Sequence, residues 1–317
     1  MTQPLLTVRD LTVSFGPQAQ PVRAVAEASF DLHPGEILGI AGESGSGKTT
    51  LCSALIRTLP RAARAQGEVV FDGRSLLDLP EREMRGLRGR EIGMVLQNPM
   101  TSLDPLFTIG NQVNEVLRER GARDTAVEAL RRVHLTAPEL RVRQYPHQLS
   151  GGMRQRVLVA MATATAPRLL IADEPTTALD ASIQDEILLL FREIRDTAGT
   201  AIIIVTHDLA AIRRLSDRVI VMYAGRIVEE GPTVRIFHAP RHPYTRGLLA
   251  SVPRIEDDEV VLQAIPGQVP NLAELPPGCA FADRCPLAQD RCRAERPGET
   301  SVGARHRVFC WQAEQGA

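Results

Sequence analysis

A short apolar segment that runs into a glycine-rich loop and then a helix constrains this chain more than any other feature. Ile37–Ala41 is continuously apolar, which is typical of a strand covered on both faces. Gly42–Thr49 follows at once and matches the pattern G-x4-G-K-[ST]. Leucines then recur every four residues, at Leu51, Leu55 and Leu59, as on one face of a helix. Strand, loop and helix in this order form the context in which the motif binds nucleotide phosphates.

The loop predicts a nucleoside triphosphate site and a role for its side chains. Its glycines allow backbone N–H groups to converge on phosphate oxygens, and the helix N-terminus adds partial positive charge. We expect Lys48 to reach the β- and γ-phosphates and the Thr49 hydroxyl to bind Mg²⁺. The residues predicted to contact ATP here are Gly42, Glu43, Ser44, Gly45, Ser46, Gly47, Lys48, Thr49 and Thr50.

Two acids follow a second buried strand. Asp173 and Glu174 come directly after the apolar segment at Leu170–Ala172, at the strand end where open α/β sheets bind ligands. We expect Asp173 to hold Mg²⁺, directly or through water, and Glu174 to polarise the attacking water as general base. The alternative is that the two acids only cap the next helix.

The order of elements predicts an α/β fold. Buried strands at Ile37–Ala41, Leu169–Ala172 and Ala201–Val205 alternate with helical patterns, which favours a mainly parallel sheet covered by helices. Leu5–Phe15 alternates in polarity as a half-buried strand, and Val22–Leu32 is expected to be another. We expect these to form an antiparallel β subdomain. Further predicted features are a helical insertion at about 98–165 and a hairpin that turns at Ala224-Gly225.

Composition excludes several classes of protein. The 317 residues carry 37 Lys and Arg against 38 Asp and Glu, so a generic nucleic-acid binder with its basic excess is not expected. The longest apolar runs, such as Ala201–Val205, are far shorter than a bilayer-spanning helix, and the N-terminus does not resemble a secretory signal. We therefore expect a cytosolic chain that forms no membrane path by itself.

Cysteines crowd the C-terminal region. Cys52 lies in an apolar helical segment and is expected in the core, whereas Cys279, Cys285, Cys292 and Cys310 lie close to the C-terminus. The gaps between these four contain five, six and seventeen residues, unlike the C-x2-C pairs of structural zinc sites. Four thiolates on an irregular loop suit a [4Fe–4S] cluster, with zinc and uncomplexed cysteines as alternatives. Prolines mark the segment before them, which predicts a main domain at 1–251 and a small irregular cysteine-rich extension at 252–317.

Further motifs show which P-loop ATPase this chain resembles. Leu149–Gln155 contains Leu-Ser-Gly-Gly about 20 residues before the acids. Ser150 with Gly151 and Gly152 at a helix start is a second anion-binding device, which would be redundant beside the first in a single site. Here the chain resembles the ATP-binding cassette (ABC) family, whose other marks follow in order: Gln97 for the Q-loop, Ala178-Leu179-Asp180 for the D-loop and His207 for the switch histidine.

The resemblance implies the remaining site roles. Ser150, Gly151 and Gly152 would bind the ATP of an opposite ABC subunit, and Asp180 would belong to the D-loop. His207 would contact the γ-phosphate and orient the water, although a lone histidine there can also cap a helix. Gln97 would ligate Mg²⁺ and sense a partner, and Phe15 would stack on adenine, although strand phenylalanines are usually core. Met153 replaces the usual signature glutamine and Asn98 stands where acids are common, but neither change removes a phosphate ligand.

Other segments narrow the resemblance to ATPases of dipeptide, oligopeptide and nickel importers. They are Gln97–Pro105, Tyr145–Arg156, His242–Arg246 and Gly278–Pro286. The resemblance implies a peripheral subunit on the cytoplasmic face of the inner membrane. Its partners would be a second ATPase subunit, more often a paralogue than a copy, two permeases and, indirectly, an extracytoplasmic solute-binding protein, with no nucleic acid. It also implies a [4Fe–4S] cluster on the four cysteines, beside ATP and Mg²⁺.

The function expected is ATP hydrolysis that drives uptake of a peptide or related small solute. An importer of nickel or another non-peptide solute is the alternative, and a soluble ABC ATPase outside transport is a more distant one. A regulatory module that binds ATP without hydrolysing it is disfavoured because Glu174 and His207 are both present.

Overall fold

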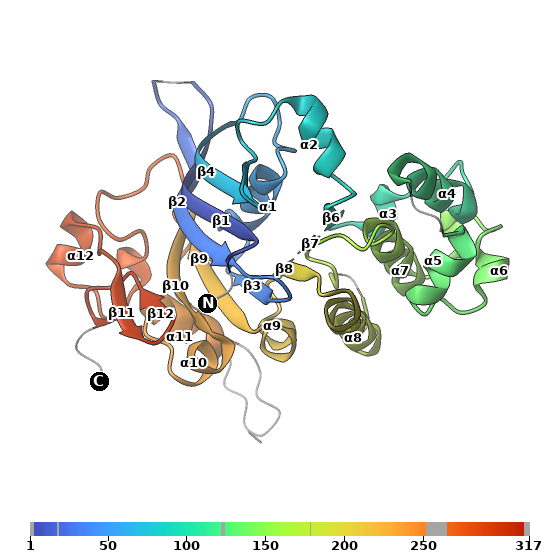
Figure 1. The fold of residues 1–317 in the computed structure, drawn as a ribbon. Coiled ribbons are helices and arrows are strands. Elements are labelled where there is room, and N and C mark those ends of the chain that lie inside the picture. Colours follow the sequence, from blue (N-terminus) through green and yellow to red (C-terminus); the bar gives the residue numbers. More distant parts are fainter. Residues whose placement is uncertain (1–2, 18, 122–123, 178, 252–264, 314–317) are drawn as a thin grey trace, which may run out of the picture. The chain divides into compact units, whose positions relative to one another are not determined.

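The computed structural model describes residues 3–17, 19–121, 124–177, 179–251 and 265–313. These form two compact units (Figure 1). Unit 1 comprises Met1–Leu5, Leu32–Ile37 and Asp78–Val205. Unit 2 comprises Leu6–Asp31, Leu38–Leu77 and Thr206–Ala317. The predicted domain boundary at residue 251 borders the range 252–264, which lies outside the described residues, and it stays a prediction.

Unit 1 is built on three parallel strands and a set of helices. β6 (Ile92–Val95) pairs with β7 (Leu169–Asp173), and β7 pairs with β8 (Ala201–Val205). Every residue of β7 and β8 is buried, which explains why the sequence shows continuous rather than alternating apolar residues there. The remaining elements are α2 (Glu81–Leu87), α3 (Pro99–Ser102), α4 (Ile109–Arg120), α5 (Ala126–Arg132), α6 (Pro138–Arg141), η1 (Pro146–Gln148), α7 (Gly151–Ala162) and α8 (Ala181–Ala198).

The helices of unit 1 begin and end at local signals. The Thr125 side chain and Glu128 form a capping box at the start of α5, and the Thr108 hydroxyl caps α4. Gly121 ends α4 and Gly199 ends α8, both in the left-handed conformation that glycine adopts without strain. The predicted helical insertion at 98–165 is therefore present as the run from α3 to α7.

Unit 2 holds an antiparallel sheet in the strand order β2-β1-β4-β5. Its strands are β1 (Leu6–Phe15), β2 (Val22–Leu32), β4 (Arg64–Phe71) and β5 (Arg74–Ser75). The register between β1 and β4 shifts between Arg9 and Thr12, where Asp10 has a positive φ. The predicted β subdomain is thus antiparallel, and its half-buried strands alternate as the sequence indicates.

A second group of strands in unit 2 joins the two ends of the chain. β3 (Ile37–Ala41) pairs in parallel with β9 (Arg218–Tyr223), which forms the predicted hairpin with β10 (Arg226–Pro232). β10 then pairs with β12 (His306–Val308), and β12 pairs with β11 (Thr300–Gly303). In Figure 1 this mixture is seen as the blue β3 from the early part of the chain and the yellow to red strands β9 to β12 from its later part. The helices are α1 (Lys48–Leu55), α9 (Leu209–Leu215), α10 (Thr233–His238), α11 (Pro243–Ala250), η2 (Ala282–Arg284) and α12 (Asp290–Ala294).

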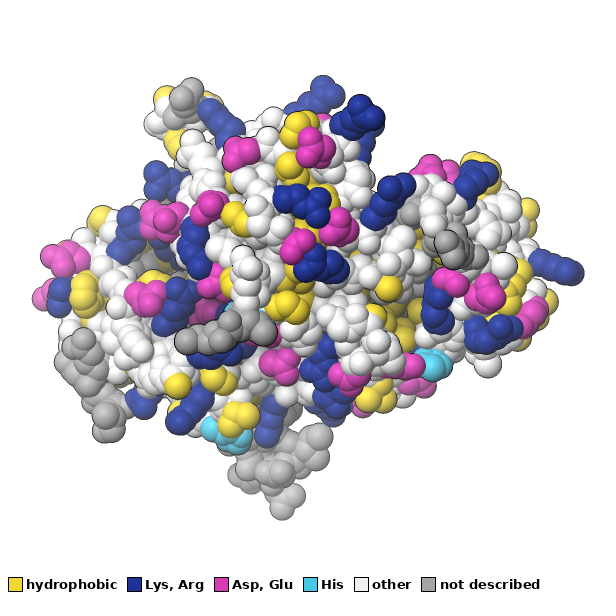
Figure 2. Space-filling model, viewed as in Figure 1, with side chains coloured by type: hydrophobic (Ala, Val, Ile, Leu, Met, Phe, Trp, Pro, Cys, Tyr) yellow, Lys and Arg dark blue, Asp and Glu magenta, His cyan; other side chains and the backbone are white. Residues whose placement is uncertain are grey.

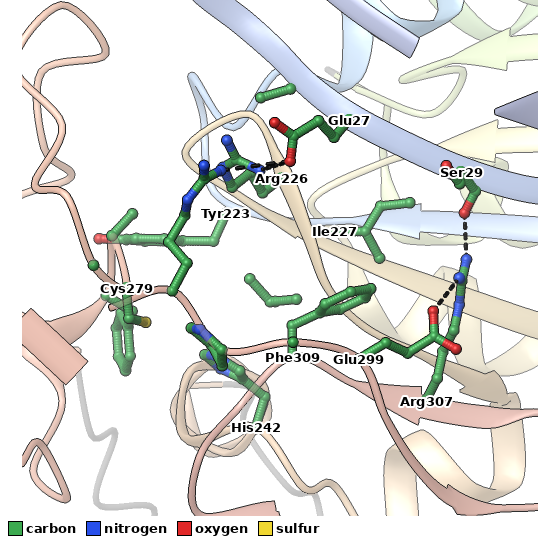
Figure 3. Close-up of a pocket in the computed structure, with 18 of the residues that line it drawn as sticks. Glu27, Ser29, Tyr223, Arg226, Ile227, His242, Cys279, Glu299, Arg307 and Phe309 are labelled. Carbon is green, nitrogen blue, oxygen red and sulfur yellow. Dashed lines mark hydrogen bonds and ion pairs between the residues drawn. The ribbon is translucent and has the colours of Figure 1, made fainter. Parts of the chain in front are cut away.

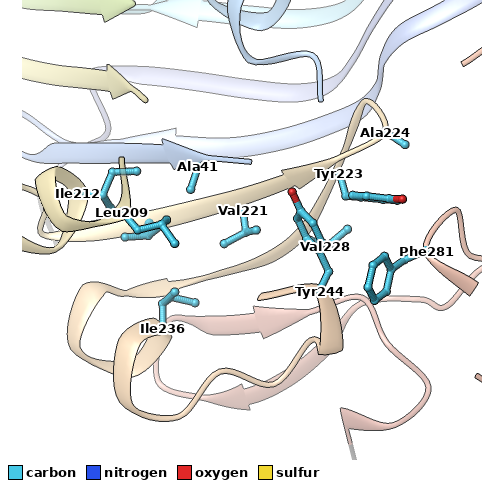
Figure 4. Close-up of a cluster of buried hydrophobic side chains, with 11 residues drawn as sticks. Ala41, Leu209, Ile212, Val221, Tyr223, Ala224, Val228, Ile236, Tyr244 and Phe281 are labelled. Atoms are coloured by element: carbon cyan, nitrogen blue, oxygen red, sulfur yellow. The ribbon is translucent and has the colours of Figure 1, made fainter. Parts of the chain in front are cut away.

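The C-terminal extension has more regular structure than its composition predicts. It contains β11, β12, η2 and α12, and β12 extends a sheet of unit 2 rather than standing apart. Phe281 of this tail lies in the same buried cluster as Tyr223 of β9 and Tyr244 of α11 (Figure 4). The tail therefore packs through apolar side chains onto the strands that carry the glycine-rich loop.

Candidate active site

The glycine-rich loop runs from β3 to α1 in unit 2. Gly42, Gly45 and Gly47 have φ values of +154°, +79° and +99°, in the region that favours glycine. A Cβ at Gly47 would lie 2.3 Å from the Ala24 carbonyl oxygen, so a larger residue does not fit. The main chain of β2 at Ala24 therefore lies directly against the loop at Gly47 and leaves no room for a side chain there.

Lys48 is folded into this loop. It is only 5% exposed, and its Nζ donates to the carbonyl oxygens of Gly42 at 2.8 Å and Glu43 at 2.9 Å. Thr49 is exposed and Thr50 half-buried on the first turn of α1. Among the described residues no side chain caps α1, and its first turn contains no acid. A glycine cradle, a buried ammonium group and an uncapped helix N-terminus fit a bound triphosphate.

Glu43 of the loop is tied to distant parts of unit 2. Its backbone N–H donates to the hydroxyl of Tyr244 at 2.8 Å, and its carboxylate accepts two hydrogen bonds from Arg284. The sequence predicts Glu43 as one of the loop residues that contact ATP, and it does not reveal either partner. Tyr244 lies in the segment His242–Arg246, and Arg284 lies in Gly278–Pro286. In the sequence analysis these two segments only narrowed the family resemblance.

The predicted catalytic acids lie at the end of β7 in unit 1. Asp173 is the last residue of the strand and is 2% exposed. Glu174 follows it with a φ of +47°, a conformation that costs a non-glycine residue energy and is concentrated at functional sites. Its N–H donates to the Val205 carbonyl at 2.7 Å, which fixes this backbone against β8.

Two neutral donors hold the carboxylate of Glu174. Gln97 Nε2 donates to Oε2 at 3.0 Å, and the Thr177 hydroxyl donates to the same oxygen at 2.9 Å. The structure therefore brings together the predicted Q-loop glutamine and the predicted general base, which are 77 residues apart in sequence. Thr177 is a contact that the sequence analysis did not include.

The Leu-Ser-Gly-Gly segment opens α7. The Ser150 hydroxyl accepts from the Met153 N–H at 3.3 Å, as an N-cap does. A Cβ at Gly152 would lie 2.5 Å from the Ile183 side chain of α8, so this glycine is needed for helix packing as well. Gly151 has more room, because a Cβ there would lie 3.3 Å from the Leu179 side chain. Ser150 and its glycines thus form a capped helix start that is exposed at Ser150.

The other predicted residues lie at the ends of their elements. Asp180 is the residue before α8, and Ala178 of the same motif lies outside the described residues. His207 is exposed two residues after β8, before α9. Phe15 ends β1 and is half-buried. The roles predicted for these residues remain predictions.

The four C-terminal cysteines line one small cavity of about 10 Å³ in unit 2. The Gln289 N–H donates to the Cys292 sulfur at 3.5 Å. Burial raises the pKa of the Cys279 thiol to about 11 and also raises the pKa of Cys285 and Cys310. Within the described ranges no three His, Cys, Asp or Glu side chains form a group that could hold a single metal ion. Cys52, by contrast, is fully buried in the core as expected.

A larger cavity of about 460 Å³ lies beside these cysteines (Figure 3). Cys279 borders both cavities. Two ion pairs lie among the side chains that line the larger cavity: Arg226 with Glu27 at 2.9 Å and Arg307 with Glu299 at 2.8 Å. Figure 2 shows the same mixture of signs on the face of the molecule in view, where basic and acidic side chains are interspersed.

Comparison with known proteins shows which family has this fold and site. Residues 25–177 match the model of the family "ABC transporter", and residues 228–292 match "Oligopeptide/dipeptide transporter, C-terminal region". The structure is similar to a dimeric post-hydrolysis state of the ATP-binding cassette MJ0796 bound to ADP and Pi, with a TM-score of 0.64, 29% identity, and coverage of 72% of this chain and 98% of that one. It is also similar to cbiO1 from Clostridium perfringens, with a TM-score of 0.62 and 26% identity over 75% of this chain and 92% of that one. The fold and the site together define an ABC ATPase, an enzyme that hydrolyses ATP.

Curated relatives identify the branch. A probable peptide ABC transporter ATP-binding protein of Sinorhizobium fredii is 47% identical, with 98% of this chain and 96% of that protein covered. The dipeptide transport ATP-binding protein DppD of Bacillus subtilis is 44% identical over 99% of this chain and 96% of its own length. The oligopeptide transport ATP-binding protein OppD of the same organism is 47% identical over 97% and 88%. The chain belongs to the family of peptide ABC transporter ATP-binding proteins.

A bilayer crossing requires a helix of about 20 predominantly apolar residues. No helix within the described residues is both long enough and apolar enough to make one.

Proposed function

We propose that this chain is the ATP-hydrolysing subunit of an importer that takes up dipeptides, oligopeptides or a related small solute. The observation that carries the ATPase part is the carboxylate of Glu174, oriented by Gln97 and Thr177 immediately after Asp173. The transport part is supported by the match of residues 228–292 and by relatives named for peptide, dipeptide and oligopeptide transport.

Each unit supplies part of the chemistry in this proposal. In unit 2, Lys48 and the loop N–H groups bind the β- and γ-phosphates, with Phe15 against adenine and His207 at the γ-phosphate. In unit 1, Asp173 and Gln97, together with Thr49 of the loop, are the side chains that would hold Mg²⁺, which would neutralise charge on the phosphate oxygens. Glu174 accepts a proton from the attacking water as general base. Because Gln97 also donates to Glu174, a shift of the Q-loop would change the orientation of this base.

We propose that a second ATPase subunit, a paralogue rather than a copy, completes each site. Its Ser150, Gly151 and Gly152 equivalents would bind the ATP held on this chain, and Asp180 would lie at the shared interface. The N-terminus of α7 supports this because it combines a hydroxyl with helix-start N–H groups, which suit an anion. The structurally similar cassette MJ0796 is dimeric in its post-hydrolysis state.

We propose that permeases dock on unit 1 and hold the chain at the cytoplasmic face of the inner membrane. Exposed apolar side chains support this: Met100 is 64% exposed, Leu106 79% and Phe107 53%. They follow Gln97 along the chain, so a permease helix placed on them would be coupled to the residue that orients Glu174. An extracytoplasmic solute-binding protein would act indirectly, through the permeases.

We propose that the four C-terminal cysteines hold a [4Fe–4S] cluster. Such a cluster takes one thiolate at each iron, so its sulfurs surround a cavity rather than one ion, and the four thiols here line one cavity. The Gln289 N–H, which donates to the Cys292 sulfur, would stabilise thiolate charge there. Anaerobic purification should give brown protein that absorbs near 400 nm and contains iron, and Cys285→Ser should lose both. Zinc instead of iron, or metal-free protein, would contradict the proposal.

Glu174→Gln tests the catalytic part. The variant should retain ATP binding and accumulate as a closed ATPase dimer, while turnover falls by about 10²- to 10⁴-fold because the general base is lost. Glu139→Gln, an exposed carboxylate on α6 outside the site, serves as the control and should keep normal turnover. Unchanged hydrolysis by Glu174→Gln would remove Glu174 from the role of base.

Uptake of labelled peptides tests the transport part. The chain, its co-purified ATPase and permeases are reconstituted in vesicles together with the binding protein. ATP-dependent accumulation of a dipeptide or oligopeptide is the expected result. Accumulation of Ni²⁺ without peptide uptake would favour the non-peptide importer, and purification without any membrane partner would contradict transport altogether.

A further inference from the structure

The acid in the glycine-rich loop is clamped by an arginine of the cysteine-rich tail. Arg284 NH1 lies 2.8 Å from Glu43 Oε2 and NH2 lies 3.0 Å from Oε1, a bidentate pair between residues 241 positions apart. The Arg284 side chain is 6% exposed and that of Glu43 is 28% exposed. Such two-pronged pairs fix geometry as well as charge, and partial burial protects this one from screening by salt.

The guanidinium group is itself held in place from several sides. Its Nε donates to the Pro266 carbonyl at 2.9 Å and NH2 donates to the Ile265 carbonyl at 3.3 Å. NH1 also donates to the Tyr223 hydroxyl at 3.3 Å, and the guanidinium carbon lies 5.7 Å from the centre of that ring. Arg284 therefore has little freedom to follow Glu43, and the position of the tail determines where the Glu43 carboxylate lies.

The backbone of Glu43 is held by the same group of side chains. Tyr244, fully buried, accepts the Glu43 N–H, and its ring packs 4.6 Å from Tyr223 and 5.4 Å from Phe281 between ring centres. Figure 4 shows these three rings together at the edge of the buried cluster. The Glu43 carbonyl in turn accepts from Lys48 Nζ, so the contacts run from Arg284 through Glu43 to the phosphate-binding lysine.

The clamp also removes an electrostatic conflict. Glu43 is an acid within a loop that binds a polyanionic triphosphate, and an unpaired carboxylate there would repel the nucleotide. Arg284 neutralises that carboxylate and directs it toward the tail. Arg284 ends η2 between Cys279 and Cys285, so a change at the cysteines would move the residue that carries out both tasks.

We propose that Arg284 is a positioning residue for ATP, through which the cysteine-rich tail sets the nucleotide affinity of the glycine-rich loop. The inference rests on ATP binding at the loop and is independent of the transported solute. It also holds whichever metal, if any, the cysteines bind. The inference requires that a shift of the tail changes the position of the Glu43 carboxylate through Arg284.

The test is equilibrium binding of a fluorescent ATP analogue with Mg²⁺ to the purified full chain. Arg284→Met keeps length and apolar contact but leaves Glu43 unpaired, and the dissociation constant should rise about tenfold. Glu43→Gln added to Arg284→Met removes the unpaired charge and should restore affinity to within about threefold of the parent. This rescue is a readout that a merely structural role of Arg284 would not produce.

Matched variants complete the design. Arg293→Met removes another arginine of the tail, paired with Asp283 at the surface, and should leave affinity unchanged. If Arg284→Met does not fold, Arg284→Lys keeps the charge without the fork and should weaken binding by a few-fold. In the assembled complex, Arg284→Met should change turnover at saturating ATP by less than twofold. The substitution should therefore raise KM and leave kcat nearly unchanged.

Cys285→Ser tests transmission from the cysteines. It should weaken ATP binding in the parent chain but have no further effect in the Arg284→Met/Glu43→Gln background, where the clamp is already absent. An unchanged dissociation constant for Arg284→Met, or equal effects of Cys285→Ser in both backgrounds, would overturn the proposal. Neither outcome depends on peptide uptake, so failure of the transport proposal would be seen separately, in the vesicle assay.

Discussion

Two carboxylates of the nucleotide-binding motifs, Glu174 in unit 1 and Glu43 in unit 2, are held in opposite ways. Glu174 receives hydrogen bonds from a neutral amide and a neutral hydroxyl, and Gln97, one of these donors, is exposed. Glu43 is paired with a buried guanidinium group through two hydrogen bonds. Neutral donors can be exchanged for water at small cost, whereas separating a buried ion pair leaves an uncompensated charge. The comparison indicates an adjustable catalytic carboxylate in one unit and a fixed loop carboxylate in the other.

Gly47→Ala should have the largest effect on stability and ATP binding, because the added Cβ lies within the fixed loop itself. The added Cβ would lie 2.3 Å from the Ala24 carbonyl oxygen at a φ of +99°, so both contact and conformation oppose it. We expect the free energy of unfolding to fall by about 3 kcal/mol and ATP binding to be lost. Denaturant unfolding and nucleotide titration measure the two effects.

Gly45→Ala is the control for this substitution. Its φ of +79° is also unfavourable, but a Cβ there meets no atom within 4 Å among the described residues. The loss of stability should be about 1 kcal/mol, and ATP binding should persist. Equal effects of the two alanines would show that the loop is not fixed by contact with its neighbours.

Acid should destabilise the fold through protonation of His242, which caps the helix that carries Tyr244, the residue that accepts the Glu43 N–H. Burial, as the largest effect, lowers the pKa of this histidine to about 4, with the Glu229 carboxylate acting in the opposite direction and Arg246 adding to the decrease. As the pH falls, His242 is therefore protonated in the unfolded chain before it is protonated in the folded one. The contribution of neutral His242 to stability is complete above pH 6.5 and is lost as the pH falls toward 4, by about 3 kcal/mol in total.

His242→Asn separates this titration from the capping role. The His242 ring accepts the Tyr244 N–H at 3.0 Å at the start of α11, and asparagine can cap the helix without titrating. Unfolding followed between pH 8 and pH 4 should give a flatter profile for the variant than for the parent. Parallel profiles would assign the acid sensitivity to other groups.

Thr177→Val should have a smaller effect, if the catalytic carboxylate is adjustable. It removes one neutral donor from Glu174 Oε2, so we expect kcat to fall by about three- to tenfold, equivalent to about 1 kcal/mol. Thr177→Ser keeps the hydroxyl and should retain the parent rate. A loss as large as that of Glu174→Gln would show that the carboxylate works only in one fixed orientation, contrary to the comparison.

Phe15→Leu should give the smallest effect. Phe15 is half-buried at the end of β1, outside the clamp around Glu43. Loss of stacking on adenine should raise the dissociation constant for ATP about threefold, and Phe15→Tyr should restore it. An unchanged constant for Phe15→Leu would assign this ring to the core alone, whereas a much larger rise would show that the base, and not the loop, dominates binding.

Local sequence predicted much of the fold. The continuous apolar runs at β3, β7 and β8 are buried strands, the leucine pattern after the glycine-rich loop lies on α1 at Leu51 and Leu55, and the Ala224-Gly225 turn joins β9 to β10. These elements follow from short-range periodicity and turn chemistry, which act within about ten residues. The C-terminal tail was less predictable, because β12 is three residues long and is a strand through its pairing with β10 and β11.

The phosphate-binding loop, the two acids after a buried strand and the second anion-binding helix start can all be read from the amino-acid sequence, since each motif is contiguous. The side chains that hold the acids become visible only once the chain is folded. Gln97 meets Glu174 across 77 positions and Arg284 meets Glu43 across 241. Such pairs form because packed strands and aromatic rings bring distant segments together, and once they are partly buried, an acid without its donor would be costly. No spacing along the chain encodes that choice of partner.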